Sequence, residues 1–139
     1  MAVFLQMNAL AWIAAALAAM AIGFLWYSPV LFGSKWRAAS GMTKEQVSAG
    51  MKGVPMAIIL GAICQLVIGY GLLHFIIETD VLSASEAIEL AFIVWLSFFA
   101  APSFHAVVWE KKPIAYWAIN AGYQLAVFAV MGVILALWR

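Results

Sequence analysis

The sequence predicts an all-α integral membrane protein with four transmembrane helices, and its composition carries this prediction. Of 139 residues, 68% are hydrophobic and 9% are charged, whereas soluble domains are about 45–50% apolar and about 25% charged. The charged residues are also clustered, which leaves four long stretches that lack them. A chain of this length cannot hide so much apolar surface in a water-soluble fold, and about 20 helical residues span the hydrocarbon of a bilayer.

The first predicted helix covers about residues 5–27. Ser28-Pro29 marks its end, because proline pushes the residue before it out of the helical conformation. Small residues such as Ala18 and Ala21 are of the kind that a signal peptidase accepts. No Lys or Arg precedes the apolar run, as a secretory signal requires, so we expect this helix to be retained.

Residues 28–53 form the one sizeable loop, and we predict a short interfacial, amphipathic segment within it. Its first part, around Trp36 and Arg37, mixes apolar, aromatic and basic residues, a composition suited to the headgroup plane. Its second part begins with Thr43 and Gln46, which fit a capping box for a short helix.

The remaining helices are predicted at about residues 54–77, 85–108 and 114–138. Pro55 and Pro113 suit the first turn of a helix, where the missing N–H needs no replacement. Ser83 and Glu86 form a capping-box pattern at the start of the third helix. The turn between the last two helices is short, so these are predicted to be antiparallel neighbours. We expect residues 1–139 to form a single transmembrane domain.

The basic residues predict the topology. Loops 28–53 and 109–113 hold six of the seven Lys and Arg residues: Lys35, Arg37, Lys44, Lys52, Lys111 and Lys112. By the positive-inside rule, these loops are cytoplasmic and both termini lie outside. The seventh basic residue, Arg139, is at the C-terminus.

Two sequence motifs carry a family resemblance. The first motif consists of Trp26, Tyr27, Ser28, Pro29, Phe32, Gly33 and Trp36. The second motif includes Glu110, Asn120, Gly122 and Tyr123. Together they bracket nearly the whole chain and resemble a family of small bacterial membrane proteins, domain of unknown function 1761. The resemblance implies four helices in a bacterial cytoplasmic (inner) membrane and implies no activity. It directs attention to the end of the first helix and the start of the last.

Polar residues inside the predicted spans mark a candidate site, because unpaired polar groups in hydrocarbon are unfavourable. At about 1.5 Å per helical residue, Gln65, Ser97 and Gln124 fall near the bilayer midplane, while His105 and Asn120 lie nearer the cytoplasm. We expect these side chains to meet in a polar seam. The alternative is that the seam is interhelical packing, since neutral amides commonly hydrogen-bond between membrane helices.

Pro102 lies within the third helix and would free the carbonyl of Phe98, because proline has no N–H. Free carbonyls beside a polar seam bind ions in some transporters. Most prolines in membrane helices only kink the helix, so this interpretation remains one of two.

Patterns that indicate other chemistry are few. A net charge of +1 does not favour nucleic acid. His74 and His105 lie near opposite faces and no thiolate or acid cluster accompanies them, so we expect no metal and no cofactor. No phosphate-binding or nucleophile motif appears, which leaves a lipid-modifying enzyme using His105 and Glu110 as the least favoured reading.

Two functions remain for the sequence. The first is a homo-oligomer in the lipid bilayer whose polar seam binds or conducts a small solute or ion. The second is a structural or accessory subunit of a larger membrane complex.

Overall fold

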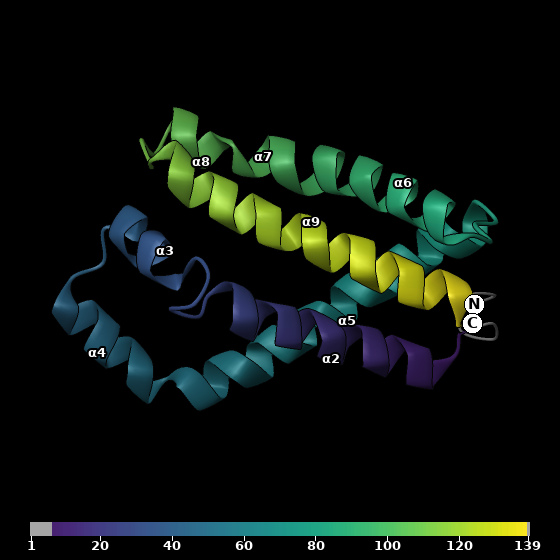
Figure 1. Cartoon of the computed structure of the whole chain (residues 1–139), viewed down its shortest axis with the longest axis horizontal. Coiled ribbons are helices and arrows are strands. Elements are labelled where there is room, and N and C mark those ends of the chain that lie inside the picture. Colours follow the sequence, from purple (N-terminus) through teal and green to yellow (C-terminus); the bar gives the residue numbers. More distant parts are fainter. Residues whose placement is uncertain (1–6, 139) are drawn as a thin grey trace.

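A computed structural model describes residues 7–138, and the regular elements among them are all helices. Four spans are long and apolar enough to cross a membrane: α2 (Ala9–Trp26), α5 (Val54–Glu78), a broken third span (Ala84–Val108) and α9 (Ile114–Leu137). The predicted all-α membrane fold is therefore confirmed. Figure 1 shows the spans as a bundle in which the start of α2 and the end of α9 lie at the same end.

The first span is shorter than predicted. Asn8 caps α2, because its side-chain oxygen accepts hydrogen bonds from two backbone N–H groups of the first turn. Helix therefore begins at Ala9, and residues 5 and 6 of the predicted helix lie outside the described residues. The helix ends at Trp26, just before Ser28-Pro29, as expected.

The third span is continuous in space but broken in its hydrogen bonding. It consists of α6 (Ala84–Trp95), the π-turn η1 (Leu96–Ala100), α7 (Ala101–Ser103) and α8 (His105–Val108). The predicted capping box of Ser83 and Glu86 opens it. Pro102 is the second residue after the π-turn, and both prolines and π-turns are usual causes of breaks in long helices.

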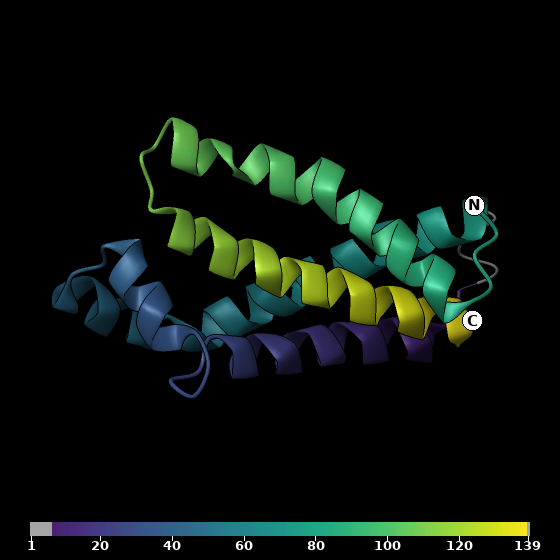
Figure 2. The ribbon, with the colours of Figure 1, turned by 45° about the horizontal axis from the view of Figure 1, so that its top comes forward.

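The loop between the first two spans is mostly helical. It contains α3 (Gly33–Ser40) and α4 (Lys44–Lys52), and Thr43 with Gln46 forms the predicted capping box of α4. Figure 2 shows both short helices beyond the end of α2 and the start of α5, at the end of the bundle opposite to the start of α2.

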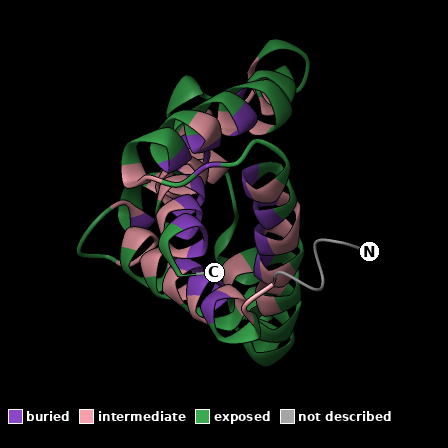
Figure 3. Cartoon of the chain, turned by 90° about the vertical axis from the view of Figure 1, so that its right-hand side faces the viewer, coloured by how far each residue is buried: buried purple, intermediate pink, exposed green. Residues whose placement is uncertain are grey.

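The buried core lies mainly in the half of the bundle nearer to the start of α2 and the end of α9. The largest fully buried side chains come from α5 and α9: Leu73, Ile76, Val127, Met131 and Leu135. A face of alanines on α2, which includes Ala11, Ala15 and Ala19, is also buried. Buried residues are those that face neighbouring helices, and the outward faces are exposed, as lipid-facing helices require (Figure 3).

Contacts between helices place α9 at the centre. It packs against α2, α5 and α6. The contact with α6 confirms that the last two spans are neighbours, and the short turn between them makes them antiparallel, as the sequence predicted. The candidate site lies along this central helix.

Candidate functional site

The end of α2 and the following α3 are fastened to α9 by three side chains of the first motif. The indole Nε1 of Trp26 donates to the carbonyl of Ile119 at 3.0 Å. The hydroxyl of Tyr27 donates to Oδ1 of Asn120 at 2.7 Å, and Nε1 of Trp36 donates to the same oxygen at 3.0 Å. Asn120 therefore joins two elements of the first motif to the second motif.

The orientation of the Asn120 amide follows from these donors. An indole N–H only donates, so the amide atom that faces Trp36 is the oxygen. Tyr27, one residue beyond α2, stays protonated as the second donor. Its burial, followed by the nearby phenols of Tyr123 and Tyr116, raises the pKa of Tyr27 above its ordinary value.

A tight chain reversal aims α3 back towards α9. The N–H of Phe32 donates to the carbonyl of Trp26 at 3.0 Å, and the N–H of Gly33 donates to the carbonyl of Ser28 at 2.9 Å. A Cβ atom at position 33 would lie 2.2 Å from the carbonyl oxygen of Tyr27. This reversal therefore requires glycine, which explains the Phe32-Gly33 pair of the motif.

Two further residues of the second motif, Gly122 and Tyr123, lie close to neighbouring helices. Gly122 lies against the indole of Trp26, and a Cβ there would be 3.1 Å from that ring. The hydroxyl of Tyr123 donates to the carbonyl of Ala19 at 3.2 Å and accepts from Nε2 of Gln65 at 3.1 Å. The two motifs, far apart in sequence, thus form one interlocked unit.

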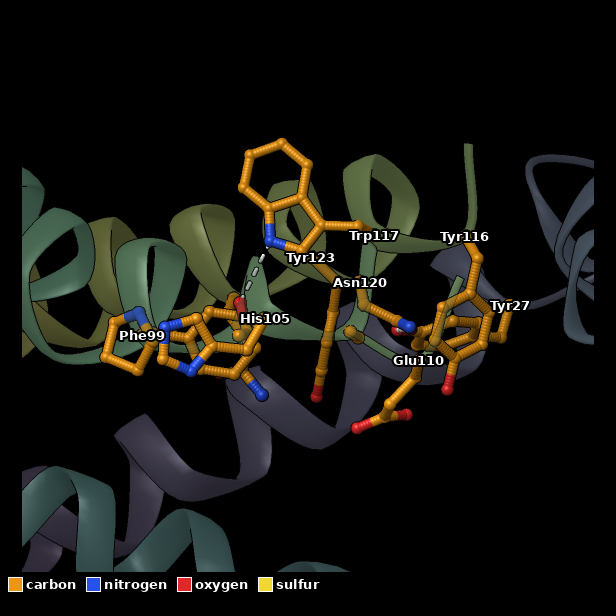
Figure 4. A pocket seen from close by; sticks show the side chains of 12 residues that line it. Tyr27, Phe99, His105, Glu110, Tyr116, Trp117, Asn120 and Tyr123 are labelled. Carbon is orange, nitrogen blue, oxygen red and sulfur yellow. Dashed lines mark hydrogen bonds between the residues drawn. The ribbon is translucent and has the colours of Figure 1, made fainter. Parts of the chain in front are cut away.

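Beside this unit lies a pocket of about 500 Å³. Its walls come from the end of α2, the broken third span and α9, and Figure 4 shows Glu110 and Tyr116 towards one end of it and Phe99 and His105 towards the other. The polar side chains that line it are Tyr27, Ser103, His105, Glu110, Tyr116, Asn120, Tyr123 and Gln124.

The structure brings together most of the predicted seam. His105, Asn120 and Gln124 line the same pocket, and Gln65 is connected to it through the hydroxyl of Tyr123. Ser97 is exposed and does not line this pocket, so it does not meet the others there. Counting residues along a helix gives the depth of a side chain but not the direction in which it faces, which explains the difference.

Sequence reasoning missed several residues of the pocket. Phe99, Ser103 and Trp117 line it, and Nε1 of Trp117 donates to Oγ of Ser103 at 3.0 Å, a bond drawn in Figure 4. Ser103 follows Pro102 directly and the sequence offered that signal, since polar residues beside a helix-breaking proline often face a cavity in membrane proteins.

Two amide oxygens lack a partner. Oε1 of Gln65 and Oε1 of Gln124 are buried, and neither receives a hydrogen bond within the described chain. Leaving a buried acceptor unpaired costs about 1–3 kcal/mol. Gln124 also contributes to the wall of the pocket.

The charge of the lining is negative. Glu110 contributes a carboxylate, and no Lys or Arg is among the lining residues that the structure describes. The two neighbouring lysines do not line the pocket. Nζ of Lys111 donates to the carbonyl of Val108 at 2.8 Å, and Nζ of Lys112 donates to that of Ser40 at 3.4 Å and lies 5.6 Å from the centroid of the Tyr116 ring. Glu110 forms no ion pair with any residue from 7 to 138.

The broken third span also leaves carbonyls short of donors. The N–H of Ala101 donates to the first carbonyl of η1, and the N–H of Phe104 donates to the last. Between these donors lie Pro102, which has no N–H, and Ser103. The N–H of Ser103 is therefore the one helical donor left for the three carbonyls of residues 97–99. These include the carbonyl of Phe98, which the sequence predicted to be free.

Comparison with known proteins supports the family resemblance. Residues 10–136 match the family model described as "Protein of unknown function (DUF1761)". This range contains both motifs and every residue that lines the pocket. No curated protein and no solved structure matches the chain.

Proposed function

This chain belongs to the DUF1761 family, whose description names no activity. We therefore propose a function from the geometry of the site. The protein binds a small polar solute in the pocket between the broken third span and α9. The observation that carries this proposal is a cavity of about 500 Å³, lined by polar side chains and by an amide, Gln124, whose buried oxygen has no partner in the described chain. Ligand sites are typically cavities of roughly this size.

The packing around the pocket supports binding rather than conduction through a single copy. On the side nearer the end of α9, Tyr123 bonds to Gln65 and to the carbonyl of Ala19. Beyond it, Val127, Met131 and Leu135 are fully buried in the apolar core. A conducting path through one chain would have to break this hydrogen-bonded and apolar layer.

The pocket is proposed to open on the cytoplasmic side of an inner membrane. It lies at the end of the bundle that carries the loops 28–53 and 109–113. These loops hold six of the seven basic residues of the chain, and such loops are cytoplasmic in most membrane proteins. The N- and C-termini are then outside.

Self-association is part of the proposal. The first half of α5 presents large apolar side chains to the outside, and Met56, Ile59, Leu60 and Ile63 are each more than half exposed. In the membrane this face contacts either lipid or another helix, and we propose that a second copy of the chain packs on it. The competing function is an accessory subunit of a larger complex, which is supported by α4, a helix without a buried residue among those described.

Ligand-dependent stabilisation tests the binding function. Methylammonium, acetate and glycerol are each added in excess to the nanodisc-embedded protein, and thermal unfolding is followed. A binding solute at 100 times its Kd stabilises the folded state by about 2.7 kcal/mol. We expect at least one probe to raise the unfolding temperature and Gln124→Leu to remove that increase.

The matched control is Ser97→Ala, because Ser97 is a polar residue of the same bundle that does not line the pocket. This variant is expected to keep the full ligand-dependent increase. Binding at this pocket would be contradicted if no probe changes the unfolding temperature, or if Gln124→Leu responds like the unchanged protein.

A further inference from the structure

We propose that the pocket selects a small organic cation that carries an ammonium group, an inference that rests on the proposed solute-binding function. The electrostatics of the lining give the first reason. Glu110 supplies a negative charge without an ion-pair partner in residues 7–138. Lys111 and Lys112 direct their ammonium groups to backbone carbonyls instead. Glu110 is the one Asp, Glu, Lys or Arg among the described lining residues, so a cation inside the pocket meets an attractive carboxylate there.

Aromatic side chains give the second reason. Tyr27, Phe99, Trp117 and Tyr123 all line the pocket. Aromatic rings attract cations to their faces, and groups of rings form the recognition sites of quaternary ammonium ligands. The same neighbourhood already holds one such contact, since Nζ of Lys112 lies 5.6 Å from the centroid of the Tyr116 ring.

Unused acceptors give the third reason. The hydroxyl hydrogens of Tyr27, Ser103 and Tyr123 are all donated to protein oxygens, so these hydroxyls meet a ligand through their lone pairs. Such lone pairs are attracted to the positively charged groups around an ammonium nitrogen and repel an anion.

Two sources supply the same chemistry. The ammonium group could belong to a free amine or to the headgroup of a lipid. The pocket lies beside the end of α2 and the turn after α8, which are the parts of the bundle nearest the predicted headgroup region. The test therefore has to separate these two sources as well as to establish the charge preference.

The test is a titration of the nanodisc-embedded full chain with tetramethylammonium and with tert-butanol, which is uncharged and of similar shape. Intrinsic tryptophan fluorescence reports binding, because Trp117 lines the pocket. We expect tetramethylammonium to bind more tightly than tert-butanol. Glu110→Gln should weaken tetramethylammonium binding by about tenfold, in line with the loss of one unit charge near the protein surface, and leave tert-butanol unaffected.

Two further variants test whether the effect is specific to the carboxylate and the aromatic rings of the pocket. Glu45→Gln removes an exposed carboxylate of α4 that does not line the pocket, and should leave the affinity unchanged. Phe99→Leu keeps an apolar side chain but removes a ring, and should weaken tetramethylammonium binding several-fold. Glu110 is exposed, so its replacement does not threaten the fold.

The lipid composition identifies the source. Methylammonium is titrated in two kinds of nanodisc that contain the same fraction of phosphatidylglycerol and therefore have the same surface charge. The remaining lipid is an uncharged glycolipid in the first kind and phosphatidylethanolamine in the second. A headgroup that occupies the pocket raises the apparent Kd of methylammonium in the second case, and a free amine as the ligand leaves it unchanged. Either result supports the ammonium preference once methylammonium binding depends on Glu110.

The inference and the function on which it rests fail differently. If tert-butanol or acetate binds as tightly as tetramethylammonium and Glu110→Gln has no effect, the pocket binds solutes but the cation preference is wrong. If no cationic, anionic or neutral probe binds to the unchanged protein, the proposed function is wrong as well.

Discussion

Replacing Gly33 with alanine is expected to lower the free energy of unfolding by about 4 kcal/mol or more, the range of the most damaging single substitutions. The added Cβ would lie 2.2 Å from the carbonyl oxygen of Tyr27 and 2.8 Å from that of Ser28. Both are backbone atoms, and the hydrogen bond from Gly33 N–H to Ser28 at 2.9 Å holds them in place. Relief of the clash requires the reversal to open, which detaches α3 from α9.

The measurement is equilibrium unfolding in detergent micelles, with tryptophan emission as the probe. Gly50→Ala is the matched control, because nothing lies within 4 Å of a Cβ at that position in α4. A glycine in a helix is less stable than alanine by about 0.5–1 kcal/mol, so this control should be neutral or slightly stabilising. A Gly33→Ala variant that stays within about 0.5 kcal/mol of the unchanged protein would refute the role of the reversal.

Asn120→Leu is expected to have the second largest effect. The substitution leaves the hydroxyl of Tyr27 and the indole N–H of Trp36 without their shared acceptor. A donor left unpaired in a buried site costs about 1–3 kcal/mol. Because both side chains are only partly buried, we expect a total loss of roughly 2–4 kcal/mol in the free energy of unfolding.

A double-mutant cycle separates this bond from general damage. Tyr27→Phe should lower the free energy of unfolding by about 1 kcal/mol in the unchanged protein and have little effect when Asn120→Leu is present. Tyr116→Phe is the matched control, because its hydroxyl has no hydrogen bond within the described chain. Additive effects of Tyr27→Phe and Asn120→Leu would show that the two residues are not coupled.

The spans could be predicted from the sequence because each depends on local chemistry. Long apolar stretches fix the existence of the helices, and the capping boxes at Thr43 and Ser83 fix two of the starts. The start of α2 was predicted too early, because the apolar run continues upstream of its cap at Asn8. Pro102 indicated a break in the third span, but the sequence did not show that the break takes the form of a π-turn over Leu96–Ala100.

The site was predictable only in part. Depth counting grouped His105, Asn120 and Gln124, and the structure places these three in the lining of one pocket. It could not determine the direction of Ser97, which is exposed, because the π-turn between α6 and α7 changes the phase of the helix. The motifs were recognised as separate features, and their contact through Asn120 required the tertiary structure, since it joins residues from opposite ends of the chain.

The most direct test of solute binding at this pocket is native mass spectrometry of the nanodisc-embedded protein with bound small molecules retained. The account predicts a single closed oligomer that carries a reproducible ligand on each chain, and Gln124→Leu should release that ligand without changing the number of chains. A bare monomer, or a ligand that remains bound to Gln124→Leu, would contradict it.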